Sequence, residues 1–184
     1  MFNMKQLVGT PLNIVVATDQ TGSFGFEGKI PWKDQPFAKE DFKRFQQITK
    51  NSICVMGYKT YQEILEMKLT RGGDINTPLL YNRESFVIST HDVTPRIESG
   101  VTFVPTIRAV VESLENEDTR ELFVLGGEKL FIESLPWTQH IYLSVVRDIY
   151  QGDRVFPLHY VNSFFEIVEG EQTDDLYFLK LRRR

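Results

Sequence analysis

The stretch LFVLGGEKLFIESL, residues 122–135, decides the fold class. Its pattern predicts an apolar strand over 121–125 that runs directly into Gly126 and Gly127, followed by a helix over 129–135. Such a turn leaves a bare backbone and a helix amino terminus at the carboxyl end of a strand, where open α/β sheets bind ligands. The stretch contains no full GxGxxG, so it is not a Rossmann fingerprint.

The rest of the chain alternates short apolar runs with helical patterns. Alternation of this kind predicts an α/β fold: a mostly parallel central sheet with helices on both faces, in three layers. Two consecutive strands at the end predict an antiparallel C-terminal edge, and an extended loop is expected over 67–82. We expect a single domain over 1–184, because no linker divides the chain. The other predicted strands are 12–18, 52–56, 85–89, 101–104, 140–146, 164–169 and 177–182, and the other predicted helices are 38–49, 60–66 and 107–115.

Composition excludes several classes of protein. With 41% apolar and 25% charged residues, the 184-residue chain is typical of a globular domain. The net charge of −4 gives no indication of a nucleic-acid partner. A single cysteine rules out an internal disulfide and suits a reducing compartment. No stretch approaches the roughly 20 apolar residues that span a bilayer, so the sequence predicts a cytoplasmic protein.

The predicted helix over 38–49 carries an acid on its apolar face. Asp41 shares that face, at three- and four-residue spacing, with Ala38, Phe42, Phe45, Ile48 and Thr49. A desolvated carboxylate needs a partner, and a ligand can supply one if the protein does not. The plainer alternative is a boundary residue beside a neighbouring lysine.

Two further segments could contact a ligand. TGSFGFEGKIPW, residues 21–32, follows the first strand and contains three glycines, which indicate a mobile loop over a site or an ordinary flexible turn. VMGYKTYQEI, residues 55–64, is a second strand-to-helix turn, in which Thr60 offers a hydroxyl and Lys59 a positive charge. Taken alone it could be a simple helix cap, but two such turns in one domain indicate one elongated phosphorylated ligand, such as a dinucleotide.

With these segments in place, the chain resembles the dihydrofolate reductase family from about residue 12 to its end. The matching blocks occur in the family's order and spacing: IVVATD, FGFEGKIPW, EDFKRF, VMGYKT, LLYNR, FVIST, VLGGEKLF, IYLSVV and GDRVFP. The resemblance implies NADPH-dependent hydride transfer to C6 of 7,8-dihydrofolate with protonation at N5. The product, tetrahydrofolate, serves one-carbon metabolism and thymidylate and purine synthesis. Residues 1–11 form an extension outside the resemblance.

The resemblance also implies the substrate site. Asp41 falls where the family's acid pairs with the pterin, Trp32 where a tryptophan holds a water beside it, and Ser144 where a threonine usually supports both. Arg83 falls where an arginine grips the folate α-carboxylate, a task suited to a bidentate guanidinium. The positions implied to line the pterin and nicotinamide pockets are Val15, Ala17, Ile30, Phe42, Phe45, Ile64 and Leu125.

The cofactor implied by the resemblance is NADPH, and no metal ligand is implied. The bond between Gly126 and Gly127 is expected to be cis, as in the family. The implied cofactor contacts are Ala17, Gly25, Lys59, Thr60, Ser89, Thr90, Gly126, Gly127, Glu128, Lys129 and Leu130. Antifolate inhibitors are expected to bind, and we expect a monomer.

Two other functions remain open at this point. A reductase of a ribosylaminopyrimidine in riboflavin synthesis can share the Gly-Gly turn and the cofactor site, but its substrate has no glutamate tail for Arg83 to bind. A non-catalytic folate or nucleotide binder, or a structural subunit, could also keep the fold. Oxidation of NADPH in the presence of each substrate separates the three.

Overall fold

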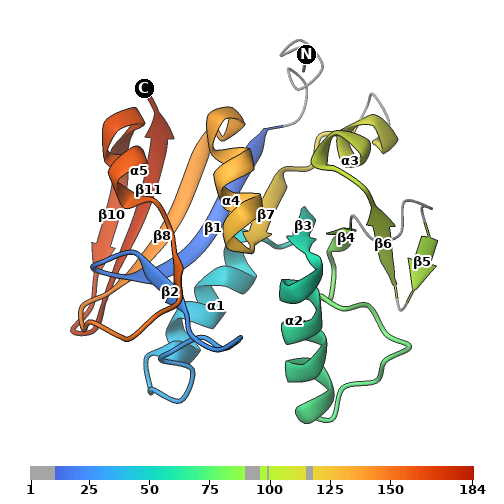
Figure 1. The fold of residues 1–184 in the computed structure, drawn as a ribbon, viewed down its shortest axis with the longest axis horizontal. Helices are drawn as coiled ribbons and strands as arrows, with labels where there is room; N and C mark the ends of the chain where they lie inside the picture. Colours follow the sequence, from blue (N-terminus) through green and yellow to red (C-terminus); the bar gives the residue numbers. More distant parts are fainter. Residues whose placement is uncertain (1–10, 90–95, 99, 115–117) are drawn as a thin grey trace. The chain divides into compact units, whose positions relative to one another are not determined.

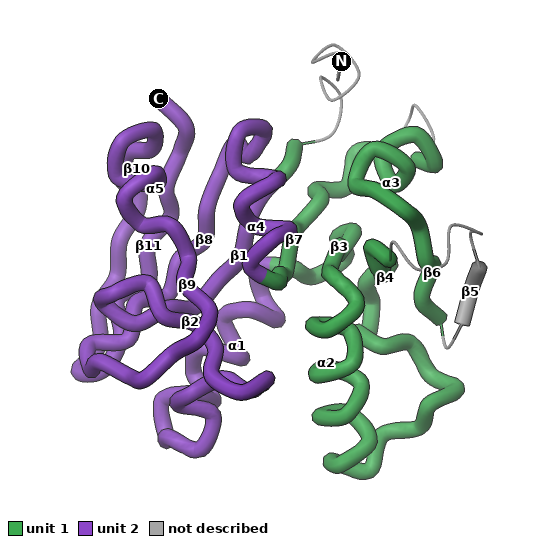
Figure 2. The backbone as a smooth tube through the Cα atoms, viewed as in Figure 1, with its two compact units in different colours: residues 1–12, 49–127 green, residues 13–48, 128–184 purple. Residues whose placement is uncertain are grey.

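The computed structural model describes residues 11–89, 96–98, 100–114 and 118–184. The backbone divides into two compact units, which Figure 2 shows in different colours. Unit 1 comprises residues 1–12 and 49–127, and unit 2 comprises residues 13–48 and 128–184.

Unit 2 is built on four strands in the order β10-β11-β8-β1 (Figure 1). Strand β1 runs parallel to β8, whereas β11 is antiparallel to both β8 and β10. This arrangement confirms the predicted antiparallel C-terminal edge. The strands are β1 (Leu12–Asp19), β8 (His140–Val146), β10 (Phe165–Gln172) and β11 (Leu176–Arg183), with a separate pair β2 (Ser23–Gly25) and β9 (Arg154–Val155). The helices are α1 (Ala38–Ile48), α4 (Glu128–Ser134), the 3₁₀ turn η2 (Leu135–Trp137) and α5 (Leu158–Phe164).

Unit 1 has its strands in the order β7-β3-β4-β6-β5. All neighbours are parallel except β5 and β6, and α2 lies beside β3 and β4 (Figure 1). Strand β3, which reads ICVMG, is apolar along its length because parallel strands are covered on both faces. The elements are β3 (Ile53–Gly57), β4 (Glu84–Ile88), β5 (Arg96–Glu98), β6 (Val101–Val104), β7 (Leu122–Gly126), α2 (Tyr58–Thr70) and α3 (Ile107–Ser113).

The structure confirms the α/β class with mostly parallel strands and corrects several details. Helix α2 begins two residues before its predicted start and continues to Thr70, so the first part of the expected loop over 67–82 is helical. Helix α5 was not predicted, and β10 begins only after it. Val161 is the residue that α5 buries, and one buried apolar position among aromatic and polar neighbours gives no helical period. Strands β2, β5 and β9 were also missed because they are two or three residues long.

Asp19, at the end of β1, is completely buried and joins two loops of unit 2. Its Oδ1 accepts the N–H groups of Thr21 and Ser23 at 2.8 and 2.9 Å and the Thr21 hydroxyl at 2.7 Å. Its Oδ2 accepts the N–H of Tyr150 at 2.9 Å. Burial raises the pKa of Asp19, but the bonds from Tyr150, Thr21 and Ser23 together outweigh it, so the pKa lies below 3.8. An ionised carboxylate therefore ties the loop after β1 to the loop after β8.

Replacement of Asp19 by asparagine is expected to lower the free energy of unfolding at pH 7 by roughly 1–3 kcal/mol. An amide would turn a donor toward one of the N–H groups that the carboxylate now accepts. Since the folded pKa is depressed, the stabilisation is complete well above pH 3.8 and is lost as the pH falls through the folded pKa. Urea unfolding between pH 7 and about pH 2 measures the difference and its loss in acid. Equal stability at pH 7, or a gap that widens in acid, would contradict this role, and Asp148→Asn on an exposed neighbouring site is the control.

Helices in the described part of the chain are all too short or too polar to cross a membrane.

Candidate active site

Helix α1 presents its apolar stripe without burying it. None of the helix residues is buried, and Phe42 is 40% exposed. Phe42 and Phe45 stack on each other with ring centroids 5.9 Å apart, and Asp41 is half-buried beside them. A helix face of this kind normally packs against a core. Here Phe42 remains partly exposed, although Ala38 on the same face packs against the core cluster that contains Trp32.

Asp41 has a specific partner from a distant strand. The Ser144 hydroxyl on β8 donates a hydrogen bond to its carboxylate, and Ser144 itself is 8% exposed. Desolvation raises the pKa of Asp41 above its ordinary value, the Ser144 bond and the nearby Arg44 charge lower it, and Glu40 raises it. Desolvation prevails, so the ionised carboxylate is held in an environment that a ligand with hydrogen-bond donors would improve.

For the substrate that the resemblance implies, removal of the Ser144 hydroxyl is expected to lower kcat/KM about tenfold at pH 7, as suits one hydrogen bond to a charged group. Ser144→Ala takes away a bond that lowers the pKa of Asp41, so the loss should deepen as the pH falls. Ser144→Thr keeps the hydroxyl and should retain activity. Steady-state kinetics of both variants measure the effect, and an alanine variant as active as the wild type would rule out this support.

Within unit 2, Trp32 and Ala17 lie close to Ser144, the hydrogen-bond partner of Asp41. Trp32 is 1% exposed and belongs to a core cluster with Phe178, against which Ala17 also packs. Ala17 on β1 pairs directly with Ser144 on β8. Val15 is two residues earlier on the same strand and is likewise half-buried. Trp32, Ala17, Ser144 and Asp41 therefore occupy one region, whereas Ile30 is 42% exposed on the preceding loop.

The glycine-rich loop is tied to residues near β9. Gly25 pairs with Arg154, and the N–H of Glu27 donates to Asp153 Oδ2 at 2.9 Å. Glu128 Oε1, at the start of α4, accepts the N–H of Val155 at 3.0 Å. Glu128 therefore has a structural role at this position. Sequence reasoning placed 153–155 in a matching block but did not assign these contacts.

The strand-to-helix turn after β3 and the glycine turn after β7 lie next to each other in unit 1. The peptide bond between Gly126 and Gly127 is cis, as the resemblance implied. A Cβ added at Gly127 would lie 3.5 Å from the Thr60 hydroxyl oxygen, and one added at Gly57 would lie 3.6 Å from the Gly127 nitrogen. The bare glycine backbone therefore lies next to the first turn of α2, with the Thr60 hydroxyl beside it. That arrangement fits a phosphate group.

The other predicted cofactor residues differ in what they can contact. Lys59 is exposed at the start of α2, and Ser89 is 9% exposed with its N–H donating to the Val104 carbonyl. Lys129 is exposed and pairs with Glu133 at 3.7 Å. Leu130 is 5% exposed, so its side chain is largely covered by the protein. Thr90 lies outside the described residues.

Arg83 is positioned by two contacts within unit 1. Its Nε donates to Thr49 Oγ1 at 2.8 Å, and its Nη1 donates to the Tyr81 carbonyl at 2.6 Å. Desolvation lowers the pKa of this half-buried guanidinium, which remains charged at any physiological pH. The side chain is therefore oriented before any carboxylate binds. Ile64 and Leu125 pack against the unit 1 core around Met56.

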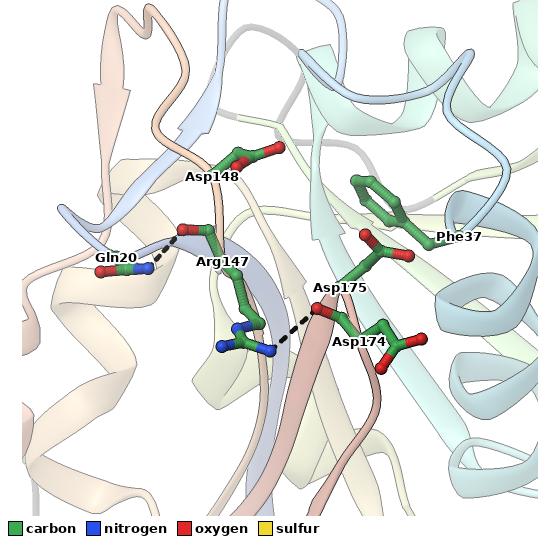
Figure 3. A pocket seen from close by; sticks show the side chains of 6 residues that line it. All are labelled: Gln20, Phe37, Arg147, Asp148, Asp174 and Asp175. Atoms are coloured by element: carbon green, nitrogen blue, oxygen red, sulfur yellow. Dashed lines mark hydrogen bonds between the residues drawn. The ribbon is translucent and has the colours of Figure 1, made fainter.

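A polar pocket of about 440 Å³ lies in unit 2 and is lined by residues other than those described above (Figure 3). The Gln20 amide donates to the Arg147 carbonyl, and the Arg147 guanidinium donates to the Asp174 carbonyl at 3.0 Å. These contacts join the loop after β1 to the turn before β11. None of the predicted site residues is among its lining residues, which are Gln20, Phe37, Arg147, Asp148, Asp174 and Asp175.

Comparison with known proteins gives consistent matches. A sequence profile described as dihydrofolate reductase matches residues 11–180. Dihydrofolate reductase type 9 of Escherichia coli is 27% identical over 83% of this chain and 80% of the relative. The dihydrofolate reductase of Bacillus subtilis is 26% identical over 88% of this chain and 83% of its own. The structure of an Enterococcus faecalis dihydrofolate reductase complexed with NADP(H) and RAB-propyl superposes with a TM-score of 0.73 at 21% identity, covering 95% of this chain and 96% of that one. This likeness confirms the predicted three-layer fold class.

Proposed function

This chain belongs to the dihydrofolate reductase family, and we propose that it reduces 7,8-dihydrofolate to tetrahydrofolate with NADPH as the hydride donor. The observation that carries the proposal is Asp41, a carboxylate on the apolar face of a helix that buries no residue. The group that supports it is the Ser144 hydroxyl. A pterin edge offers this acid paired N–H donors in addition to the Ser144 hydroxyl.

The chain's own residues bind and orient the substrate. Ionised Asp41 accepts hydrogen bonds from the pterin 2-amino group and ring nitrogen and electrostatically favours protonation at N5. No side chain in this scheme donates directly to N5, so water delivers the proton, and Trp32 holds a water beside the acid. Phe42 and Phe45 exclude bulk solvent from the pterin, which strengthens the contact with Asp41. Arg83 receives the α-carboxylate of the glutamate tail.

The cofactor fits the residues present. When bound, NADPH supplies the hydride for C6. Its phosphates are assigned to the glycine backbone at Gly126 and Gly127, to the Thr60 hydroxyl and to the Lys59 charge, since the Thr60 hydroxyl lies beside the glycine backbone. Ser89 and Thr90 are assigned to the adenosine end. Gly25 and Ala17 are assigned to the nicotinamide end.

The same site accounts for the remaining partners. Antifolate inhibitors with a diaminopyrimidine or diaminopteridine ring would use the Asp41 carboxylate in place of the substrate. We propose that the enzyme acts as a cytoplasmic monomer, in which the whole chain serves as one dihydrofolate reductase domain. Sedimentation of the purified protein tests the monomer.

The assay that tests the function is the loss of NADPH absorbance with dihydrofolate as substrate. Rapid loss that requires both reactants is the expected result. Oxidation of NADPH only with the ribosylaminopyrimidine of riboflavin synthesis would identify the related reductase instead. Binding of dihydrofolate by calorimetry without NADPH oxidation would identify a binder.

A further inference from the structure

A row of paired side chains crosses four strands of unit 2 beside helix α1. Ala17 on β1 pairs with Ser144 on β8. Ser144 in turn pairs with Phe178 on β11, and Phe178 pairs with Glu171 on β10. Directly paired residues point to the same face of a sheet. The row therefore connects the hydrogen-bond partner of Asp41 to the edge strand.

Arg44, one helical turn after Asp41, reaches onto this row. Its guanidinium carbon lies 4.4 Å from the centroid of the Phe178 ring. Its Nη1 lies 3.2 Å from Glu171 Oε2, and the Arg44 side chain is 27% exposed. Stacking on a ring and pairing with a carboxylate together orient the guanidinium. Arg44 is thus a partly shielded charge with two contacts, one of them to a Glu171 side chain that is 75% exposed.

A β-bulge brings the Glu171 carboxylate to Arg44. The register between β10 and β11 shifts by one residue after Ile167. An unbroken register would place Gly170 opposite Phe178 and would turn the Glu171 side chain to the other face of the sheet. One additional residue in the edge strand therefore supplies the partner of Arg44.

The groups that act on the Asp41 carboxylate come from two elements. Arg44 and Glu40 act from α1 itself with opposite signs, and the Ser144 hydroxyl acts from the facing strand β8. Glu40 is exposed, whereas Arg44 is partly shielded, so solvent screens Glu40 more strongly. Of the two charges, Arg44 is the one held in place by the fold.

We propose that Arg44 is a positioning residue for folate binding: its guanidinium, held by Glu171 and Phe178, keeps the Asp41 carboxylate in the ionised form that accepts the pterin. The inference rests on the proposed function, because the pterin is the ligand assigned to Asp41. Arg44 touches no reacting atom. It acts through the charge state of Asp41.

The first test follows the Asp41 carboxylate directly. Arg44→Met keeps an unbranched stem over Phe178 and removes the charge, while Lys43→Met removes the same charge from an exposed neighbour on the same helix. Carbon-detected NMR titration of aspartate carboxylates in the ligand-free protein, assigned with Asp41→Asn, gives the midpoint. The midpoint should move upward in Arg44→Met and stay in place in Lys43→Met. An unchanged midpoint in a folded Arg44→Met protein would overturn the proposal.

The second test is kinetic. The ratio of kcat/KM for dihydrofolate between Arg44→Met and the wild type cancels the protonation of the substrate itself. This ratio should lie near one at pH 9 and fall several-fold as the pH drops through the Asp41 titration. A loss that is equal at every pH would mean that Arg44 only supports the fold, and would overturn the electrostatic role.

The third test concerns Glu171. Glu171→Gln should release Arg44 and raise the Asp41 midpoint in the wild-type background, but not in the Arg44→Met background. A downward shift in both backgrounds would mean that Glu171 acts directly on Asp41 and does not hold Arg44. The NMR midpoints do not depend on turnover. A wild-type protein that fails to reduce dihydrofolate would therefore refute the proposed function. The effect of Arg44→Met on the Asp41 midpoint could still be interpreted.

Discussion

Asp41→Asn is expected to lower kcat at pH 7 by about 100-fold or more, the scale on which a positioned acid–base or electrostatic group acts. The amide offers one acceptor and one donor where the pterin edge requires two acceptors and a negative charge. The deficit should shrink in acid, because dihydrofolate then arrives already protonated. Steady-state turnover between pH 5 and pH 9 measures both effects. An asparagine variant with wild-type turnover across this range would exclude the role assigned to Asp41.

The stability of the same variant provides an internal control. Burial raises the pKa of Asp41, so the ionised carboxylate opposes folding as the pH rises through that pKa. Asp41→Asn should therefore be at least as stable as the wild type at pH 7 in urea unfolding. Loss of turnover in a protein of undiminished stability separates a functional defect from misfolding. Asp34→Asn, an exposed acid on the preceding loop, should leave both quantities unchanged.

Arg83→Met is expected to raise KM for dihydrofolate roughly 30-fold or more, because it removes a charge-assisted pair with the α-carboxylate. The effect should be confined to substrates that carry the glutamate tail. A 7,8-dihydropterin without the aminobenzoylglutamate should be reduced equally by the variant and the wild type. Kinetics with the two substrates measure the difference.

Lys50→Met is the matched control for this experiment, since it removes one exposed positive charge from the same unit. It should change KM little. Equal losses with the tailed and the tail-less substrate would indicate that Arg83 supports the Thr49 contact and the fold rather than the tail. A wild-type KM in Arg83→Met would favour an enzyme whose substrate has no glutamate tail.

The local elements were accessible from the sequence because their signals are periodic and short in range. Strands β6 and β8 begin and end at their predicted residues, and α1 starts at Ala38 as expected. The helical period also placed Asp41 on an apolar face. Helix α5 was not predicted because Val161 is its only buried position, and strands β2 and β9 were not predicted because two or three residues carry no measurable period.

The contacts that support the site could not be predicted in the same way. The Asp19 bond to Tyr150 joins loops far apart in the chain, and no local pattern marks an N–H group as the partner of a distant carboxylate. The Arg44–Glu171 pair depends on a bulge in β10. A one-residue register shift reverses the face of every later side chain, and the packing of the assembled strands decides that shift.

By itself, the sequence determined the α/β class, the glycine turn after β7, the acid on the apolar face of α1 and the family resemblance, because each depends on residue types at short or ordered spacing. The structure confirmed the Ser144 contact with Asp41 that the resemblance implied, but only the tertiary structure decided that Thr60 lies beside Gly127 and that Arg44 contacts the edge strand. The physical reason is that the position of a residue in the period of its helix or strand determines which face its side chain occupies. Strand register and the hydrogen bonds between loops determine which group that side chain contacts.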